Sequence, residues 1–179
     1  MNEELNSPGK QAKEQEKRMI GILQSRNTSA IINTIKEIRE KGRASILPEV
    51  FNLLESAEDN EIIGACIELI NDLKIEEATP YIINAIKDQS LTDIRQTLVS
   101  SCWQNGLDYS NHIELFTDLL IKDDYLVSIE AFTVIENHLD SISDEAMTRI
   151  TQKLRQASQR ASTEKKNLIN EMLNVIKEL

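Results

Sequence analysis

Two histidines and two cysteines are the side chains of this sequence best suited to metal binding or nucleophilic catalysis. His112 and His138 lie far apart in the chain, and so do Cys66 and Cys102, which form no C-x-x-C pair. Zinc sites and redox dithiols pair their ligands within a few residues. The sequence also has no glycine-rich phosphate loop, G-x-S-x-G motif or EF-hand spacing. We therefore expect no catalytic residue, no metal and no cofactor, and interpret the protein as a non-enzyme with buried, inert thiols.

The balance of charges favours a different class of partner. The 179 residues carry 20 Lys and Arg against 30 Asp and Glu, a formal net charge of −10. Acidic side chains greatly outnumber basic ones between residues 44 and 139. Because nucleic-acid binders neutralise phosphates with cations, this surplus argues against nucleic acid and favours a basic segment of another protein. Solubility alone is the other interpretation of the same charge.

No segment of the sequence predicts a membrane partner or export. The most apolar window, residues 62–70, is much shorter than the about 20 residues of a membrane-spanning helix. The N-terminus has no basic start followed by an apolar run. We expect a cytoplasmic protein with a flexible polar tail at residues 1–10, which include Pro8 and Gly9, and one folded domain at residues 11–179.

An internal repeat of roughly thirty-two residues runs through the chain. Shifting segment 47–54 (LPEVFNLL) onto segment 79–86 (TPYIINAI) superposes both prolines and both asparagines, and a further shift reaches segment 112–119. Corresponding positions form apolar rows, which include Met19/Val50/Ile82/Leu115, Ile20/Phe51/Ile83/Phe116 and Leu23/Leu54/Ile86/Leu119. The segments between them give the rows Ala30/Ile62/Ile94/Val127, Ile35/Ile67/Val99/Phe132 and Ile38/Ile70/Cys102/Ile135.

The spacing within each segment predicts an all-α protein. From about Gln11 onward, apolar residues recur at helical intervals, and short polar segments rich in Asn, Asp and Ser mark the helix ends. We expect about ten helices in five two-helix units. One helical hairpin cannot bury its apolar stripe alone, whereas stacked hairpins bury each other's stripes, so the pattern predicts an α-solenoid.

This pattern resembles the HEAT-like repeats, in particular the short type found in phycobilisome-lyase-like proteins. Pro48 and Pro80 lie near the start of a first helix, and the acidic turn at 88–93 is followed by Arg95, as is common in that family. Ile63 and Ser128 occupy the arginine position in the neighbouring units and depart from the pattern. The resemblance implies a right-handed solenoid in which the second helix of each unit lines a concave surface, and it is compatible with scaffolds, adaptors and occasional enzymes.

The single tryptophan is the candidate binding residue. Trp103 belongs to the row Arg39/Asn71/Trp103/Glu136, in which its counterparts are polar, and the neighbouring rows are polar as well. The resemblance then places Trp103 on the concave surface, where an exposed tryptophan is a typical protein-binding anchor. The predicted protein-binding residues are Trp103, Glu68, Asn71, Asp72, Ser100, Gln104, Thr133 and Glu136. The competing interpretation is that Trp103 covers a seam between helices and contributes packing alone.

Two features near the C-terminus suggest other partners. The segment 148–160 contains four basic side chains and no acidic one, which is a possible contact for RNA or for an acidic protein; they are Arg149, Lys153, Arg155 and Arg160. The last predicted helix, residues 162–179, is apolar over a wide arc and is a candidate surface for a second copy of the chain, forming a homodimer.

The sequence as a whole predicts a non-enzymatic protein-binding scaffold or adaptor that uses the concave face of a short acidic solenoid. Two alternatives stay open. One is a lyase-like chaperone or small-ligand enzyme on the same fold, by analogy with the phycobilisome-lyase-like group. The other is nucleic-acid contact through the basic C-terminal helix.

Overall fold

The computed structural model describes residues 8–178 of the chain, and residues 1–7 and Leu179 lie outside the described residues. The described part is all-helical, with ten α-helices packed in contact and no strand, which confirms the predicted all-α class. The first helix begins at Pro8, so the last three residues of the predicted tail belong to it, whereas the rest of that tail is not described. The α-helices are α1 (Pro8–Leu23), α2 (Thr28–Lys41), α3 (Leu47–Ser56), α4 (Asn60–Asn71), α5 (Thr79–Lys87), α6 (Arg95–Asn105), α7 (Ile113–Lys122), α8 (Tyr125–His138), α9 (Asp144–Ser158) and α10 (Thr163–Glu178).

Short 3-10 helices lie between the α-helices. They are η2 (Ala44–Ile46), η3 (Glu76–Ala78), η4 (Gln89–Leu91), η5 (Ser110–His112) and η6 (Leu139–Ser141). Each of η2, η3 and η5 runs directly into the odd-numbered α-helix that follows it. Between residues 8 and 178, no helix has the length and apolar character needed to cross a membrane.

The polar segments predicted as helix breaks contain the residues that cap the helices. The side chains of Asn27, Asp59 and Asp124 accept hydrogen bonds from backbone N–H groups in the first turns of α2, α4 and α8, at 3.0, 2.9 and 3.0 Å. Gly42 and Gly106 follow α2 and α6 with φ values of 62° and 70°, a left-handed conformation that favours glycine. Local sequence thus fixes where these helices begin and end.

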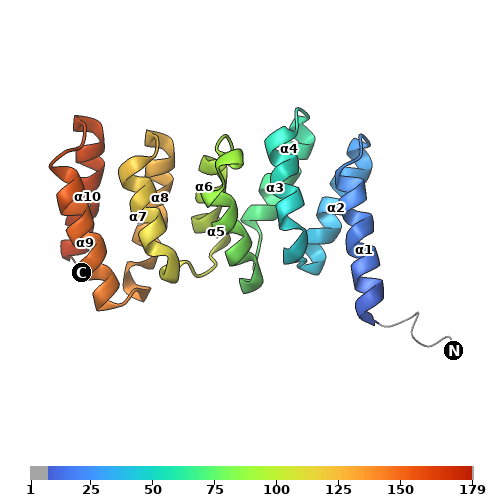
Figure 1. Cartoon of the computed structure of the whole chain (residues 1–179), viewed down its shortest axis with the longest axis horizontal. Coiled ribbons are helices and arrows are strands. Elements are labelled where there is room, and N and C mark those ends of the chain that lie inside the picture. The colour runs from blue at the N-terminus through green and yellow to red at the C-terminus, as the bar shows by residue number, and fades with distance from the viewer. Residues whose placement is uncertain (1–7, 179) are drawn as a thin grey trace.

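Successive helices pair along the chain, and the pairs stand in a row along the longest axis of the molecule, with α1 at one end and α9 and α10 at the other (Figure 1). The even-numbered helices form one layer, in which α2 contacts α4, α4 contacts α6 and α6 contacts α8. The odd-numbered helices form the second layer, in which α1 contacts α3, α3 contacts α5 and α7 contacts α9. Each helix pair therefore packs mainly on the pairs next to it in sequence.

The repeated apolar rows form the core between the two layers. All four members of two rows are buried: Leu23, Leu54, Ile86 and Leu119 on the odd helices, and Ile38, Ile70, Cys102 and Ile135 on the even helices. Each fully buried Leu or Ile side chain contributes roughly 1.5–3 kcal/mol to folding. The polar rows that flank them on the even helices stay exposed or half-exposed, so the period found in the sequence separates core from surface.

One polar position makes the same contact in two successive helix pairs. Arg95 Nε donates to the carbonyl oxygen of Ile86, near the end of α5, at 3.1 Å, and its Nη1 donates to Asp123 Oδ2 at 3.1 Å. The corresponding residue of the next pair, Ser128, donates its hydroxyl to the carbonyl oxygen of Leu119, near the end of α7, at 3.2 Å. Leu119 and Ile86 belong to the same row, so the correspondence extends to the hydrogen bond itself.

Ser128 carries no positive charge, unlike its counterpart Arg95, and a cation from α10 lies at this position instead. Lys165 Nζ donates to the carbonyl oxygen of Leu120 at 3.1 Å and also contacts Ser128 Oγ. Arg95 and Lys165 therefore each place a positive charge at the C-terminal end of an odd helix, where backbone carbonyls lack partners within the helix. Burial lowers the pKa of the Lys165 ammonium, whereas the Asp123 carboxylate opposes that shift.

Candidate functional site

The predicted binding residues lie on the exposed side of the layer of even helices. We call the exposed side of α4, α6 and α8 the even-helix face. Glu68 and Asn71 belong to α4, and Asp72 follows that helix directly. The remaining five come from the other two helices: Ser100, Trp103 and Gln104 from α6, and Thr133 and Glu136 from α8.

Three of these residues form a polar link between α4 and α6. Asn71 Nδ2 donates to Gln104 Oε1 at 2.9 Å, and Gln104 Nε2 donates to Ser100 Oγ at 3.0 Å. They border a shallow cavity of about 240 Å³ that Gln96 and Thr97 also line. Amide and hydroxyl groups both donate and accept hydrogen bonds, so this cavity suits a polar, uncharged part of a ligand.

Two of the predicted acidic residues are paired with a cation of the chain itself. Arg39 of α2 reaches both Glu68, at 3.5 Å, and Asp72. All three side chains are largely open to solvent, so this cluster contributes little to stability. It shows instead that the face accommodates a guanidinium between two carboxylates.

The predicted anchor, Trp103, is 38 % exposed, and its indole N–H donates to Glu130 Oε2 at 2.8 Å. Glu130 was not among the predicted site residues. Thr133 instead donates its hydroxyl to the backbone carbonyl of Ile129, and Glu136 lies exposed on the last turn of α8. The structure thus brings Trp103 to α8, but the carboxylate that it binds is Glu130 and not Glu136, which shares its row.

Three exposed hydrophobic side chains on α8, in addition to Trp103, were missed by sequence reasoning. The exposed large hydrophobic side chains among the described residues are Trp103, Tyr125, Leu126 and Ile129, and all four lie on α6 and the first turns of α8. Leu126 is one turn before Glu130 on the same side of the helix. A signal for Leu126 exists in the sequence, because its counterparts Glu61 and Asp93 are acidic. We call these four residues the apolar patch.

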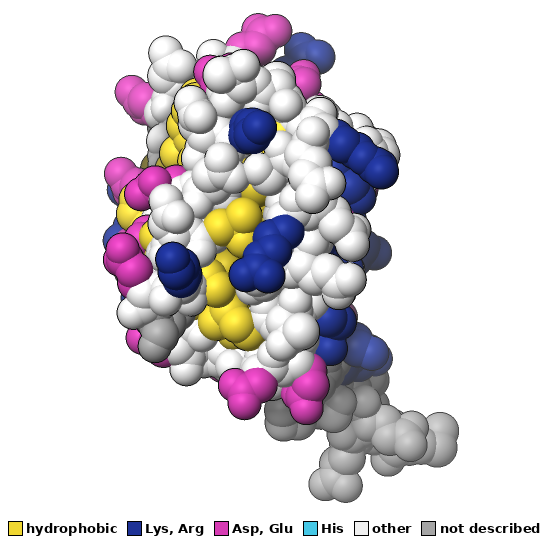
Figure 2. Space-filling view, turned by 90° about the vertical axis from the view of Figure 1, so that its left-hand side faces the viewer, with side chains coloured by type: hydrophobic (Ala, Val, Ile, Leu, Met, Phe, Trp, Pro, Cys, Tyr) yellow, Lys and Arg dark blue, Asp and Glu magenta, His cyan; other side chains and the backbone are white. Residues whose placement is uncertain are grey.

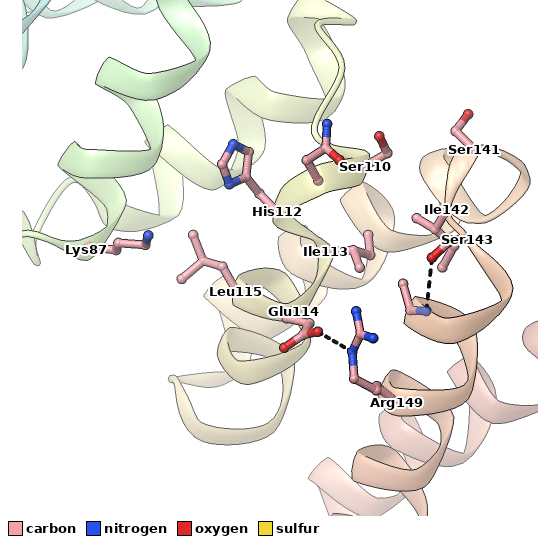
Figure 3. A pocket seen from close by; sticks show the side chains of 12 residues that line it. Lys87, Ser110, His112, Ile113, Glu114, Leu115, Ser141, Ile142, Ser143 and Arg149 are labelled. Carbon is pink, nitrogen blue, oxygen red and sulfur yellow. Dashed lines mark hydrogen bonds and ion pairs between the residues drawn. The ribbon is translucent and has the colours of Figure 1, made fainter.

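Another cavity, of about 500 Å³, lies between the starts of α7 and α9 (Figure 3). Figure 3 shows Lys87 and His112 on one side of it and Ser141 and Ser143 on the other, with Glu114 bound to Arg149 below. Arg149 Nε donates to Glu114 Oε1 at 2.7 Å.

Three polar groups of this cavity, on Glu114, Arg149 and Ser143, already have structural roles. Ser143 Oγ accepts the backbone N–H of Ala146 and caps α9, so this hydroxyl is engaged in helix capping rather than paired with a base. Burial, together with the nearby Lys87 ammonium, lowers the pKa of His112. The arrangement is that of a seam between helix pairs, and we assign no reaction to it.

The two cysteines lie in the core, as the apolar rows indicate. Cys66 and Cys102 are both fully buried, and burial raises the pKa of each thiol to about 12. A reactive cysteine requires an accessible site that stabilises the thiolate. Within residues 8–178, no three His, Cys, Asp or Glu side chains are grouped as metal ligands.

The basic segment predicted near the C-terminus is partly neutralised within the chain. Arg149 pairs with Glu114, and Lys153 Nζ pairs with Asp118 Oδ2 at 2.6 Å, so two of the four cations of this segment bind carboxylates of α7. These pairs weaken the case for a nucleic-acid contact there, because an ion pair must be broken before a phosphate can bind.

The end of the molecule formed by α9 and α10 shows hydrophobic side chains between Lys and Arg side chains (Figure 2). Ile169 and Met172 of α10 are buried against the rest of the chain, whereas Leu173 and Ile176 are half-buried. The apolar arc predicted for this helix is therefore used in part for packing within the chain. Docking of a second copy on the remainder stays a prediction.

Comparison with known proteins adds no family to this description. No protein-family model matches the chain, and no curated protein matches it either. The candidate function therefore rests on the geometry of the even-helix face and the charges around it.

Proposed function

We propose that the protein is a non-enzymatic binding module that holds a segment of another protein on the even-helix face. We propose further that its fold is a short right-handed α-solenoid of five HEAT-like repeats, with the even helices lining the concave side. The apolar patch carries the functional proposal, because the exposed large hydrophobic side chains of the described residues all lie on α6 and α8, two helices that pack against each other.

The repeat interpretation is supported by the sequence separation of the polar contacts between helix pairs. Thr28 and Asp59 are 31 residues apart, and Asn71 and Gln104 are 33 apart. Lys74 Nζ donates to the carbonyl oxygen of Asn105, across 31 residues. Contacts that recur at about the sequence period are expected when equivalent units stack side by side.

The size of the apolar patch supports a binding role. A tryptophan or tyrosine side chain has roughly 150–250 Å² to bury, and the exposed fractions range from 38 % for Trp103, Tyr125 and Ile129 to 56 % for Leu126. The four side chains together therefore leave on the order of 300 Å² of surface uncovered, which is the size of the largest apolar patch on a typical monomer, a patch that is often functional. At about 25 cal/mol per Å², covering it supplies roughly 7 kcal/mol before the costs of association are subtracted.

The polar surroundings suit a peptide better than a small ligand. The cavity between α4 and α6 is shallow and is lined by Ile67 together with amide and hydroxyl side chains, whereas small-molecule pockets bury most of the ligand in a deep, largely apolar cleft. Two of the four patch residues, Trp103 and Tyr125, are of the residue types that are enriched in the hot spots of protein interfaces.

The experiment is affinity capture from a lysate of the native cells, with wild type compared with Trp103→Ala and Leu126→Asp. Both side chains are exposed, so the variants are expected to keep the helical circular-dichroism spectrum. The matched control is Asn84→Asp, which adds the same charge on the exposed side of α5, in the other layer.

We expect a partner that wild type and Asn84→Asp retain and that both patch variants lose. A partner retained equally by all four proteins binds elsewhere and refutes the assignment of the patch. Loss of the helical spectrum in Trp103→Ala shows that Trp103 mainly packs, in which case Leu126→Asp decides the question alone.

A further inference from the structure

The three helices of the even-helix face offer carboxylates and no exposed cation. Neither α4 nor α8 contains Lys or Arg, and the one basic residue of α6, Arg95, is 8 % exposed and bound to Ile86 and Asp123. The carboxylates of these helices are Glu61, Glu68, Glu130 and Glu136. The exposed charges that these three helices themselves contribute are therefore all negative, and two of the cations that reach them, Lys74 and Lys165, bind a backbone carbonyl or the Ser128 hydroxyl.

One end of the face already shows how this charge is satisfied. Arg39 occupies the row position of Trp103 two helix pairs nearer the N-terminus, and it reaches forward to Glu68 and Asp72 of the following pair. Trp103 reaches forward in the same way, to Glu130, but it brings an indole N–H in place of a guanidinium.

The two carboxylates of α8 consequently lack a cation. None of the ion pairs among the described residues includes Glu130 or Glu136. Their neighbours on the exposed side of α6 and α8 are the apolar patch and uncharged polar groups. A binding surface of this kind is complementary to a group that has an apolar part and a positive charge close together.

We infer that the occupant of the even-helix face is a protein segment in which large apolar residues are flanked by Lys or Arg. This inference rests on the proposed function and names the partner chemistry. The apolar side chains cover Trp103, Leu126 and Ile129, and a cation binds Glu130 or Glu136, as Arg39 binds Glu68. An acidic segment is repelled by the same carboxylates, and so is a nucleic acid.

The test uses Trp103 as its own reporter, because it is the single tryptophan of the chain. The probe is a short synthetic peptide in which two leucines are flanked by lysines. One comparison peptide has glutamates in place of the lysines, and another has serines in place of the leucines. Titration is followed by the tryptophan emission, which shifts to shorter wavelength when the indole is covered.

We expect saturable binding of the lysine–leucine peptide with a blue shift, and no comparable binding of the other two. Replacing both carboxylates of α8 (Glu130→Gln with Glu136→Gln) is expected to weaken binding about twofold to fivefold, as the loss of one exposed ion pair does. The matched control, Glu77→Gln, removes an exposed carboxylate in η3 and is expected to leave the affinity unchanged. Leu126→Ser tests the apolar contact and is expected to abolish the blue shift.

The outcomes separate this inference from the proposed function. The partner chemistry is overturned if the glutamate peptide binds equally well, or if none of the three peptides binds. In either case, lysate capture that depends on Leu126 still supports the apolar patch as a binding site. Binding of the lysine–leucine peptide without a change in the Trp103 emission, and unaffected by Leu126→Ser, shows diffuse charge attraction and overturns the inference as well.

Discussion

Replacing Arg95 with methionine removes the most buried cation contact between two neighbouring helix pairs. The Arg95 side chain joins the end of α5, through the carbonyl of Ile86, to Asp123 at the end of α7, with both hydrogen bonds at 3.1 Å. Methionine keeps a long apolar stem in the same place and deletes both contacts. The change therefore isolates the polar contribution of this side chain from its packing.

The expected loss of stability combines two terms. A buried carbonyl left without its donor costs about 1–3 kcal/mol. The ion pair has side chains that are 10 % and 17 % exposed, which places it between surface pairs, worth about 0–1 kcal/mol, and fully buried pairs, whose disruption costs about 3–5 kcal/mol. Because the charge of Lys165 remains close to Asp123, we take the lower part of that interval and expect Arg95→Met to cost about 2–4 kcal/mol in total.

The assay is urea denaturation followed by far-ultraviolet circular dichroism, with Arg149→Met as the matched control. Arg149 also pairs with a carboxylate on the neighbouring helix pair, but the two side chains are 59 % and 53 % exposed, so the control is expected to lose less than about 1 kcal/mol. Arg95→Lys keeps the charge without the planar fork and is expected to fall between the two. Equal losses for Arg95→Met and Arg149→Met would refute the reasoning.

Three further predictions follow from the same structure. Lys165→Met is expected to cost about 1–3 kcal/mol, because the carbonyl of Leu120 loses a charged donor, and to speed hydrogen exchange of α10 amides more than of α4 amides. Folding lowers the pKa of His112, so below the ordinary histidine value of 6.5 the unfolded state binds more protons than the folded state. Urea titrations are therefore expected to show a free energy of unfolding that decreases as the pH falls below this value. The decrease is expected to be smaller in His112→Gln. The thiols of Cys66 and Cys102, with pKa raised to about 12, are expected to react with a thiol-specific chromogenic reagent only after urea is added; prompt reaction of the native protein would contradict their burial.

The apolar rows and the helix ends could be predicted from the sequence because they depend on local spacing. Leu54 and Ile86 occupy equivalent positions, and both are buried. Asp59 and Asp124 were in segments predicted as helix breaks, and both cap a helix. These features need only the period of the helix and of the repeat, which a single sequence displays.

The partner of Trp103 could not be predicted in this way. Its row counterpart is Glu136, yet the indole binds Glu130, nearly two turns earlier on α8. Side chains on a helix lean toward its N-terminus, so a long residue contacts the neighbouring helix before the position that the repeat matches to it. A row therefore identifies which face a residue occupies, but not which side chain it touches.

His138 illustrates a second limit. Its row contains Lys41, Leu73 and Asn105, a mixture that predicts neither core nor surface. In the structure its ring is buried, with Nδ1 2.8 Å from the carbonyl oxygen of Val134 and Nε2 accepting the backbone N–H of Tyr109 at 3.1 Å. That contact depends on the path of the loop after α6, which a helical period does not encode.

The contacts that join neighbouring helix pairs also set an order in which the protein can be completed during its synthesis. Trp103 bonds to a residue 27 positions later, and Asn71 to one 33 positions later, so each pair finds its polar partners soon after the next pair has left the ribosome. The fourth pair differs, because the carbonyl oxygen of Leu120 gains its hydrogen bond only after Lys165, 45 positions downstream, has been synthesised. During translation, the end of α7 is thus the last of these helix ends to gain its cation.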